Sequence, residues 1–177
     1  MKIQTSTVTK LMVTNIPDLY PISIYLEDLG PERGKITVTC FDDSWSYFWS
    51  HMGEGNTIRS FFPQCDNQYI IGKFASHLPQ TVDDMDKLAA AAKDYICKER
   101  RTGDFTKEVA RELYDDVEYL PGYESSDTTE YREQMYKIFG DEWYYQVPQQ
   151  SNHKYEYLCR IINAVKEALR IESGGAS

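Results

Sequence analysis

Carboxylates are the abundant groups in this sequence that could do acid–base or metal chemistry, with 28 Asp and Glu among 177 residues. Four of them fall near the ends of predicted strands and helices: Asp42, Asp43, Glu54 and Asp66. Hard divalent cations prefer clustered oxygen ligands, so these four residues define one candidate function, a metal-dependent hydrolase. Three of them, Asp42, Asp43 and Asp66, stand where a helix N-cap is expected, because their oxygens can accept hydrogen bonds from the first N–H groups of a helix. We favour capping, predict no catalytic residue, metal or cofactor, and keep the hydrolase as the alternative.

Histidines and cysteines add little to this list. His51, His77 and His153 have no partner at a spacing that marks a catalytic pair. The sequence contains no phosphate-binding, dinucleotide-binding, esterase, zinc-protease or EF-hand motif. Its four cysteines are too widely spaced for a zinc site, and we expect them to be reduced. The sequence therefore indicates a binding protein more strongly than an enzyme.

Most of the negative charge lies in one segment. The formal net charge is −9, and residues 104–157 hold 13 acidic and 5 basic residues, a net charge of −8, together with nine tyrosines. Tyrosine is enriched at protein interfaces, and an acidic surface steers a basic partner toward it. We predict a partner-binding surface here, with a solvated acidic face as the alternative. Its predicted residues are Glu112, Asp115, Asp116, Glu118, Tyr119, Tyr123, Glu124, Glu130 and Glu133.

The same charge argues against direct binding of nucleic acid, which requires a basic footprint. Rings that could stack on bases occur at Trp45, Phe48 and Trp49. With Met52 they occupy positions i, i+3, i+4 and i+7, the spacing of one face of a helix. We therefore expect these rings to pack in a core.

Period-two alternation predicts an N-terminal antiparallel β-meander of three strands. The strands are expected at Thr5–Thr14, Ile22–Glu27 and Lys35–Phe41, separated by turns that contain Gly, Pro, Asn or Asp. The remaining two-thirds reads as mostly helical. The predicted class is therefore α+β, with the meander packed against the helical C-terminal two-thirds.

Capping residues and apolar spacing define the expected helices. Thr81 with Asp84, and Asp127 with Glu130, resemble capping boxes at two helix starts. The expected helices span 45–52, 57–62, 66–76, 81–103, 106–120 and 127–139, and a last helix runs from residue 151 or 152 to 172. We predict one domain over residues 1–172 and a disordered tail over 173–177.

The N-terminal residues lack the apolar run of an export signal, and no apolar stretch approaches the roughly 18 residues that span a membrane. We therefore expect a cytoplasmic protein that makes no membrane contact. Self-association stays open.

Several short motifs span most of the chain. In the first half they are Leu26–Pro31 with Gly34–Val38, Trp45–Ser46 with Trp49 and Met52–Gly53, and Phe61–Phe62 with Cys65–Asp66 and Tyr69–Ile70. Near the end they are Gly140–Trp143 and Tyr157–Ile162. Read together, the motifs resemble small proteins encoded by tailed phages and prophages of enteric bacteria. The resemblance transfers no catalytic residue, and it implies an accessory protein that interferes with host defence or host enzymes.

The acidic segment and the resemblance lead to one functional prediction. The protein is expected to be a non-enzymatic phage accessory protein that binds and inhibits a host protein in the host cytoplasm. A basic, nucleic-acid-binding defence complex, such as a CRISPR effector or a restriction enzyme, is the expected target. An acidic surface can occupy a groove that is made for phosphates.

Overall fold

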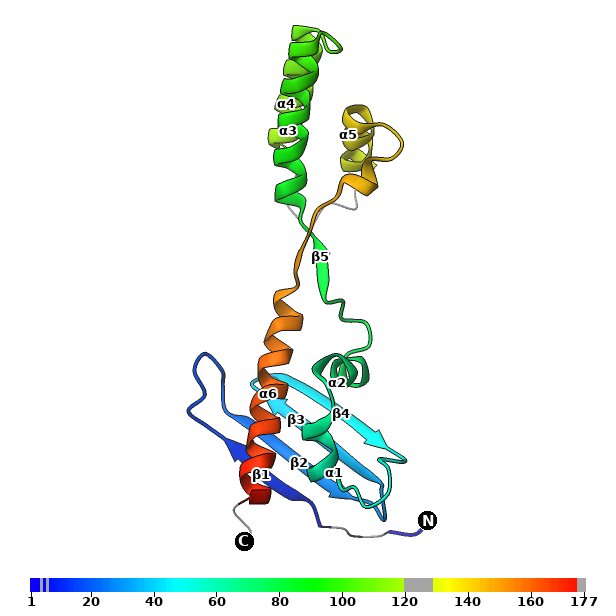
Figure 1. Ribbon diagram of the computed structural model, residues 1–177, viewed down its shortest axis with the longest axis vertical. Helices are drawn as coiled ribbons and strands as arrows, with labels where there is room; N and C mark the ends of the chain where they lie inside the picture. Colours follow the sequence, from blue (N-terminus) through cyan, green and yellow to red (C-terminus); the bar gives the residue numbers. More distant parts are fainter. Residues whose placement is uncertain (4, 6, 120–128, 175–177) are drawn as a thin grey trace. The chain divides into compact units, whose positions relative to one another are not determined.

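The computed structural model describes residues 1–3, 5, 7–119 and 129–174, and its N-terminal part is a four-stranded antiparallel sheet (Figure 1). The strands lie side by side in chain order: β1 (Thr9–Val13), β2 (Ile22–Asp28), β3 (Gly34–Cys40) and β4 (Asp43–Trp49). Every second residue of β2 and β3 is buried, so one face of the sheet lies on a core. The α+β class and the meander are confirmed, with four strands instead of three.

The fourth strand replaces the helix that was predicted over residues 45–52, and that prediction is wrong. Trp45, Tyr47 and Trp49 alternate with smaller or more exposed residues, so the segment also satisfies a period of two. Aromatic residues favour strands, and a two-residue turn at 41–42 leads directly from β3 into β4. Pairing with β3 along the whole of β4 decides between the two periods.

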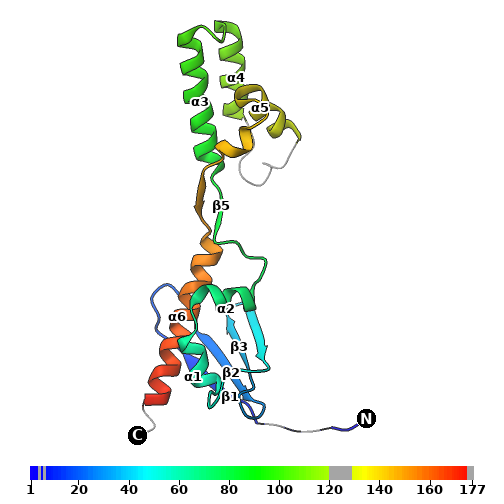
Figure 2. The same ribbon diagram turned by 45° about the vertical axis from the view of Figure 1, so that its right-hand side comes forward.

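Helices cover one face of this sheet (Figures 1 and 2). They are α1 (Ile58–Phe61), the short 3₁₀ helix η1 (Phe62–Gln64), α2 (Asn67–Phe74) and α6 (His153–Gly174). The side chains of Thr57 and Asp66 cap α1 and α2, and Asn152 Oδ1 accepts from the Lys154 N–H at 3.0 Å. These caps confirm the predicted helix starts near residues 57, 66 and 152.

Two basic side chains tie the helices to the rest of this unit. Arg59 on α1 pairs with Asp28 at 3.1 Å and with Glu172 at 3.2 Å. Lys166 on α6 is buried and donates to the Cys65 carbonyl oxygen at 2.6 Å. Burial lowers the pKa of Lys166, because a low-dielectric environment disfavours its charged form.

Residues 81–151 form a helical unit with its own core. It contains β5 (Thr81–Asp83), α3 (Met85–Thr102), α4 (Lys107–Tyr119), α5 (Thr129–Phe139), the 3₁₀ helix η3 (Trp143–Gln146) and β6 (Gln149–Ser151). Strands β5 and β6 pair antiparallel. Leu88 and Ile96 of α3 pack with Leu113 of α4 and Met135 of α5. These helices confirm the predicted helical character of the C-terminal two-thirds.

The structure corrects two helix boundaries. Thr81 begins β5, and Asp84 is the true N-cap of α3, accepting from the Lys87 N–H at 3.0 Å. Helix α6 includes residues 173 and 174, which were expected in the tail. The predicted cap of α5, Asp127, lies outside the described residues.

The chain divides into two compact units. Unit 1 comprises residues 1–80 and 152–177, and unit 2 comprises residues 81–151. The prediction that residues 1–172 form one domain, which would unfold as a whole, stays a prediction. Among the described helices, none combines the length and the apolar character needed to cross a lipid bilayer.

Candidate functional site

Helix α4 in unit 2 has two opposite faces. Ala110, Leu113 and Val117 are buried in the core of unit 2. On the opposite face, spacings of four, three and four residues align exposed side chains in one row. We call this row the acidic stripe: Glu108, Glu112, Asp115 and Tyr119.

The charges of the acidic stripe are only weakly compensated. Arg111 lies 3.9 Å from Asp115, and both side chains are largely exposed. An exposed pair of this kind contributes little to stability and exchanges readily for another partner. Within the described residues, Glu108 and Glu112 form no ion pair. The stripe therefore presents carboxylates that a basic surface can contact.

Other predicted site residues lie away from the stripe. Glu118 pairs with Lys93 of α3, and this hydrogen bond raises the pKa of Lys93. Asp116 is half-buried, and Glu133 is exposed on α5. Three predicted residues, or their side chains, fall outside the described part of the chain: Tyr123, Glu124 and Glu130. Of the nine predicted residues, the structure aligns Glu112, Asp115 and Tyr119.

Sequence reasoning missed Glu108 as a member of this row. Its position four residues before Glu112 places both carboxylates on one side of a helix. The apolar series of Ala110, Leu113 and Val117 marks the opposite side. Comparing the helical positions of the acidic residues with those of the apolar residues would have identified Glu108.

Net charge differs sharply between the units. Unit 2 holds 17 acidic and 9 basic residues, a formal charge of −8, whereas unit 1 holds 11 acidic and 10 basic residues, a charge of −1. The predicted acidic segment, residues 104–157, runs past unit 2 into α6. Its last two tyrosines, Tyr155 and Tyr157, therefore belong to unit 1.

Unit 2 also exposes several tyrosine rings. Tyr119, at the end of the acidic stripe, is 85% exposed, and Tyr145 is 73% exposed. Tyr136 and Tyr144 are exposed as well. Tyrosine supplies rigid contact area with a polar tip, and it is enriched at protein interfaces.

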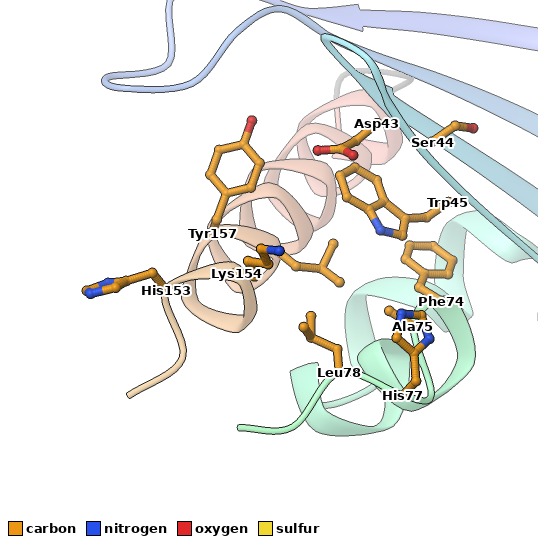
Figure 3. Close-up of a pocket in the computed structure, with 11 residues that line it drawn as sticks. Asp43, Ser44, Trp45, Phe74, Ala75, His77, Leu78, His153, Lys154 and Tyr157 are labelled. Carbon is orange, nitrogen blue, oxygen red and sulfur yellow. The ribbon is translucent and has the colours of Figure 1, made fainter. Parts of the chain in front are cut away.

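Unit 1 contains a groove of about 550 Å³ between the start of β4, the end of α2 and the first turns of α6 (Figure 3). Trp45, Phe74 and Leu158 give it an apolar lining. Asp43 and Lys154 supply charged groups at its edge. The groove is a binding cavity of ordinary size for a small ligand.

The polar groups that line this groove include a carboxylate, an ammonium group, a phenol and two imidazoles. The Tyr157 hydroxyl lies 3.4 Å from Cys40 Sγ, and this hydrogen bond together with burial raises the pKa of Tyr157 to about 12. His77 and His153 lie at opposite ends of the groove in Figure 3. Among the described residues, no hydrogen bond joins either histidine to Asp43.

The carboxylates of the hydrolase alternative are not brought together. Asp66 caps α2 by accepting from the Tyr69 N–H at 2.6 Å. Asp42 lies in the turn before β4, so its expected role as a helix N-cap, like that of Asp43, is wrong. In the described part of the chain, no three His, Cys, Asp or Glu side chains are grouped closely enough to hold a metal ion.

Comparison with known families identifies the chain at the family level. Residues 1–171 match the family model Phage_phiTE_072, which is described as a phage family. The match includes both units and all the described strands and helices except the last residues of α6. No curated protein and no solved structure matches the chain. The chain therefore belongs to the phage family Phage_phiTE_072.

Proposed function

We propose that this phage protein is a non-enzymatic accessory protein that binds and inhibits a basic protein of an enteric bacterial host. The acidic stripe on α4 is the proposed contact surface. The observation that carries the proposal is the concentration of eight of the nine net negative charges in unit 2. Three of its carboxylates share the exposed face of one helix with Tyr119.

The proposed mechanism is occlusion of a groove that normally holds nucleic acid. Carboxylates four residues apart on a helix are about 6 Å apart along its axis, so they can follow a row of Lys and Arg side chains. A net charge of −8 on unit 2 accelerates the encounter with such a groove. A nucleic-acid-binding defence complex, such as a CRISPR effector or a restriction enzyme, fits this chemistry.

Affinity capture from a host lysate, with three charge reversals in the stripe, tests the proposal. The stripe variant carries Glu108→Lys, Glu112→Lys and Asp115→Lys in the full chain. A matched control carries Asp42→Lys, Glu54→Lys and Asp94→Lys, which changes the net charge equally at exposed positions outside the stripe.

The original chain and the control are expected to capture the same basic, nucleic-acid-binding protein. The stripe variant is expected to lose about tenfold or more of this capture, because both charge steering and contact are removed. Added nucleic acid should displace the partner from the original chain. Equal capture by the two variants, or the absence of a basic partner, would show that the proposal is wrong.

A further inference from the structure

The second face of the sheet in unit 1 carries none of the helices described for that unit. Figures 1 and 2 show α1, α2 and α6 on the same side of the four strands. Along β2 and β3, the side chains that point to the other side are half-buried, in alternation with fully buried core residues. This second face is therefore available to a partner as far as the described residues of unit 1 are concerned.

The strand register places aromatic, basic and hydroxyl side chains together on this face. Tyr25 of β2 pairs with Lys10 of β1 and Thr37 of β3, and Thr37 pairs with Ser46 of β4. One step along the face, Lys35 pairs with Phe48. We call this surface the open sheet face: Lys10, Tyr25, Lys35, Thr37, Ser46 and Phe48.

A cation lies over the ring of each aromatic residue on the open sheet face. Lys10 Nζ is 5.4 Å from the centroid of the Tyr25 ring. The guanidinium of Arg33, from the loop before β3, is 5.8 Å from the centroid of the Phe48 ring. Phe48 is 40% exposed. A base that displaces this cation and stacks on the ring would bring its phosphate next to the displaced positive charge.

The charge of this face is opposite to that of the whole chain. Lys10 and Lys35 of the face and the neighbouring Arg33 contribute three positive charges, and the neighbouring Glu27, which pairs with Lys35 at 3.4 Å, contributes one negative charge. The net charge of −9 argues against nucleic acid only as an average over both units. When the net charge is counted for each unit separately, the argument against nucleic acid applies to unit 2. It leaves the open sheet face of unit 1 free to bind an anion.

We propose that the open sheet face binds single-stranded nucleic acid, with bases stacked on Tyr25 and Phe48 and phosphates held by Lys10, Arg33 and Lys35. Stacking platforms combined with cations are the usual means of binding unpaired strands, because every base has a flat aromatic face. Thr37 and Ser46, whose hydroxyl oxygens are 2.9 Å apart, add hydrogen-bonding groups between the rings.

The positions of the rings specify how the strand is bound. Tyr25 and Phe48 lie two strands and two residues apart, which corresponds to about 12 Å on a sheet. This separation is several times the step of about 3.4 Å between stacked bases, so the rings receive bases that are not neighbours. A duplex is excluded from this mode because its bases are already stacked inside the helix. The inference does not depend on the acidic stripe.

Fluorescence anisotropy with a labelled oligothymidylate of about 16 nucleotides tests this proposal on the full chain. The single strand is expected to bind at low salt more tightly than a duplex of equal length. Phe48→Ala should weaken binding between about fivefold and a hundredfold, as the loss of one stacked base does. Lys10→Glu changes an exposed side chain, so the fold should stay intact. This variant should weaken binding of the single strand and reduce the salt dependence of binding.

Matched controls separate the face from the rest of the surface. Tyr145→Ala removes an exposed ring in unit 2, and Lys154→Glu reverses an exposed lysine of unit 1 outside the face. Both control variants should bind the oligonucleotide like the original chain. Absence of binding, equal binding of the duplex, or unchanged binding by Phe48→Ala and Lys10→Glu would overturn the proposal.

Two further outcomes would assign the face to a different occupant and would also overturn the proposal. The first is competition by polyglutamate as effective as competition by unlabelled oligothymidylate, which would indicate an acidic protein. The second is self-association of the chain that Lys10→Glu abolishes. That result would indicate the acidic surface of a second copy.

Discussion

Unit 1 and unit 2 build their cores from different elements, and they differ in net charge. Unit 1 covers one sheet face with helices and buries a core rich in Ile, and its net charge is −1. Unit 2 packs α3, α4 and α5 around a smaller described core, and its net charge is −8. The difference shows that composition averaged over the whole chain describes neither unit. Function is better argued for each unit by itself.

A cavity in each core tests whether the two units are stabilised independently. Leu88→Ala in unit 2 and Ile24→Ala in unit 1 each remove a fully buried side chain, and each should cost about 2 to 5 kcal/mol of unfolding free energy. Because the cores are separate, each change should lower the midpoint of its own unit alone. Denaturant unfolding, monitored by tryptophan fluorescence, measures the two midpoints.

The tryptophans provide a reporter for each unit. Trp143 lies in unit 2, and Trp45 and Trp49 lie in unit 1. Replacing Trp45 and Trp49 by Phe isolates the signal of unit 2, and Trp143→Phe isolates that of unit 1. If Leu88→Ala shifts both signals equally, residues 1–172 unfold as one domain and the separation into units does not extend to stability.

High pH should distinguish the units through two tyrosines. Burial in unit 2 raises the pKa of Tyr131 from 10.0 to about 12. The unfolded chain loses this proton near pH 10 while the folded unit keeps it, so the contribution of Tyr131 is complete below pH 10 and falls as the pH rises toward 12. The resulting loss of unfolding free energy amounts to about 2 to 3 kcal/mol.

Tyr131→Phe should remove this part of the loss of unfolding free energy that unit 2 shows at high pH. It should leave the stability of unit 1 unchanged. Tyr157→Phe is the matched change in unit 1, because the pKa of Tyr157 is also raised to about 12. Unfolding midpoints measured across this pH range test both variants. An unchanged alkaline loss in Tyr131→Phe would contradict the account.

The close packing of unit 1 predicts opposite effects for one substitution at two glycines. A Cβ at Gly34 of β3 would lie 3.1 Å from Ile58 Cβ and 3.2 Å from Met52 Cε, so Gly34→Ala should cost about 1 to 3 kcal/mol. A Cβ at Gly72 of α2 meets no atom within 4 Å. Gly72→Ala should therefore stabilise unit 1 by up to about 1 kcal/mol. Thermal unfolding of the two variants measures both signs.

The smallest expected effect concerns the acidic stripe itself. Glu112→Lys and Asp115→Lys change exposed side chains, so the unfolding free energy of unit 2 should change by no more than about 0.5 kcal/mol. The measurement is the Trp143 transition at low and high salt. A loss above about 2 kcal/mol would mean that the stripe is retained for folding and not for binding.

Local patterns in the sequence predicted most elements of the fold. Three strands agree with the structure within a few residues because alternation is a local signal. Asp66 acts as a helix cap as expected, and Thr57 and Asn152 lie at predicted helix starts, because capping depends on neighbouring residues. Strand β4 was missed because its aromatic residues satisfy two periods and the pairing with β3 is not visible locally.

The division into units and the acidic stripe needed information that the sequence pattern does not contain. The Asn152 N–H donates to the Gln80 carbonyl oxygen at 3.1 Å, which closes unit 1 around a long insertion. Composition indicated the acidic segment, but only the orientation of α4 separates Glu108 and Glu112 from Glu118, which pairs with α3. Long-range contacts of this kind depend on the complete fold.

Photo-crosslinking in host cells tests the central claim, that unit 2 binds the partner, most directly. A photoreactive amino acid replaces Glu112 in the acidic stripe or Ser76, an exposed residue of unit 1 outside both proposed surfaces. The account predicts that position 112 crosslinks a basic, nucleic-acid-binding host protein and that Glu108→Lys with Asp115→Lys abolishes the product. A product at position 76 with none at position 112, or one unaffected by the charge reversals, would contradict it.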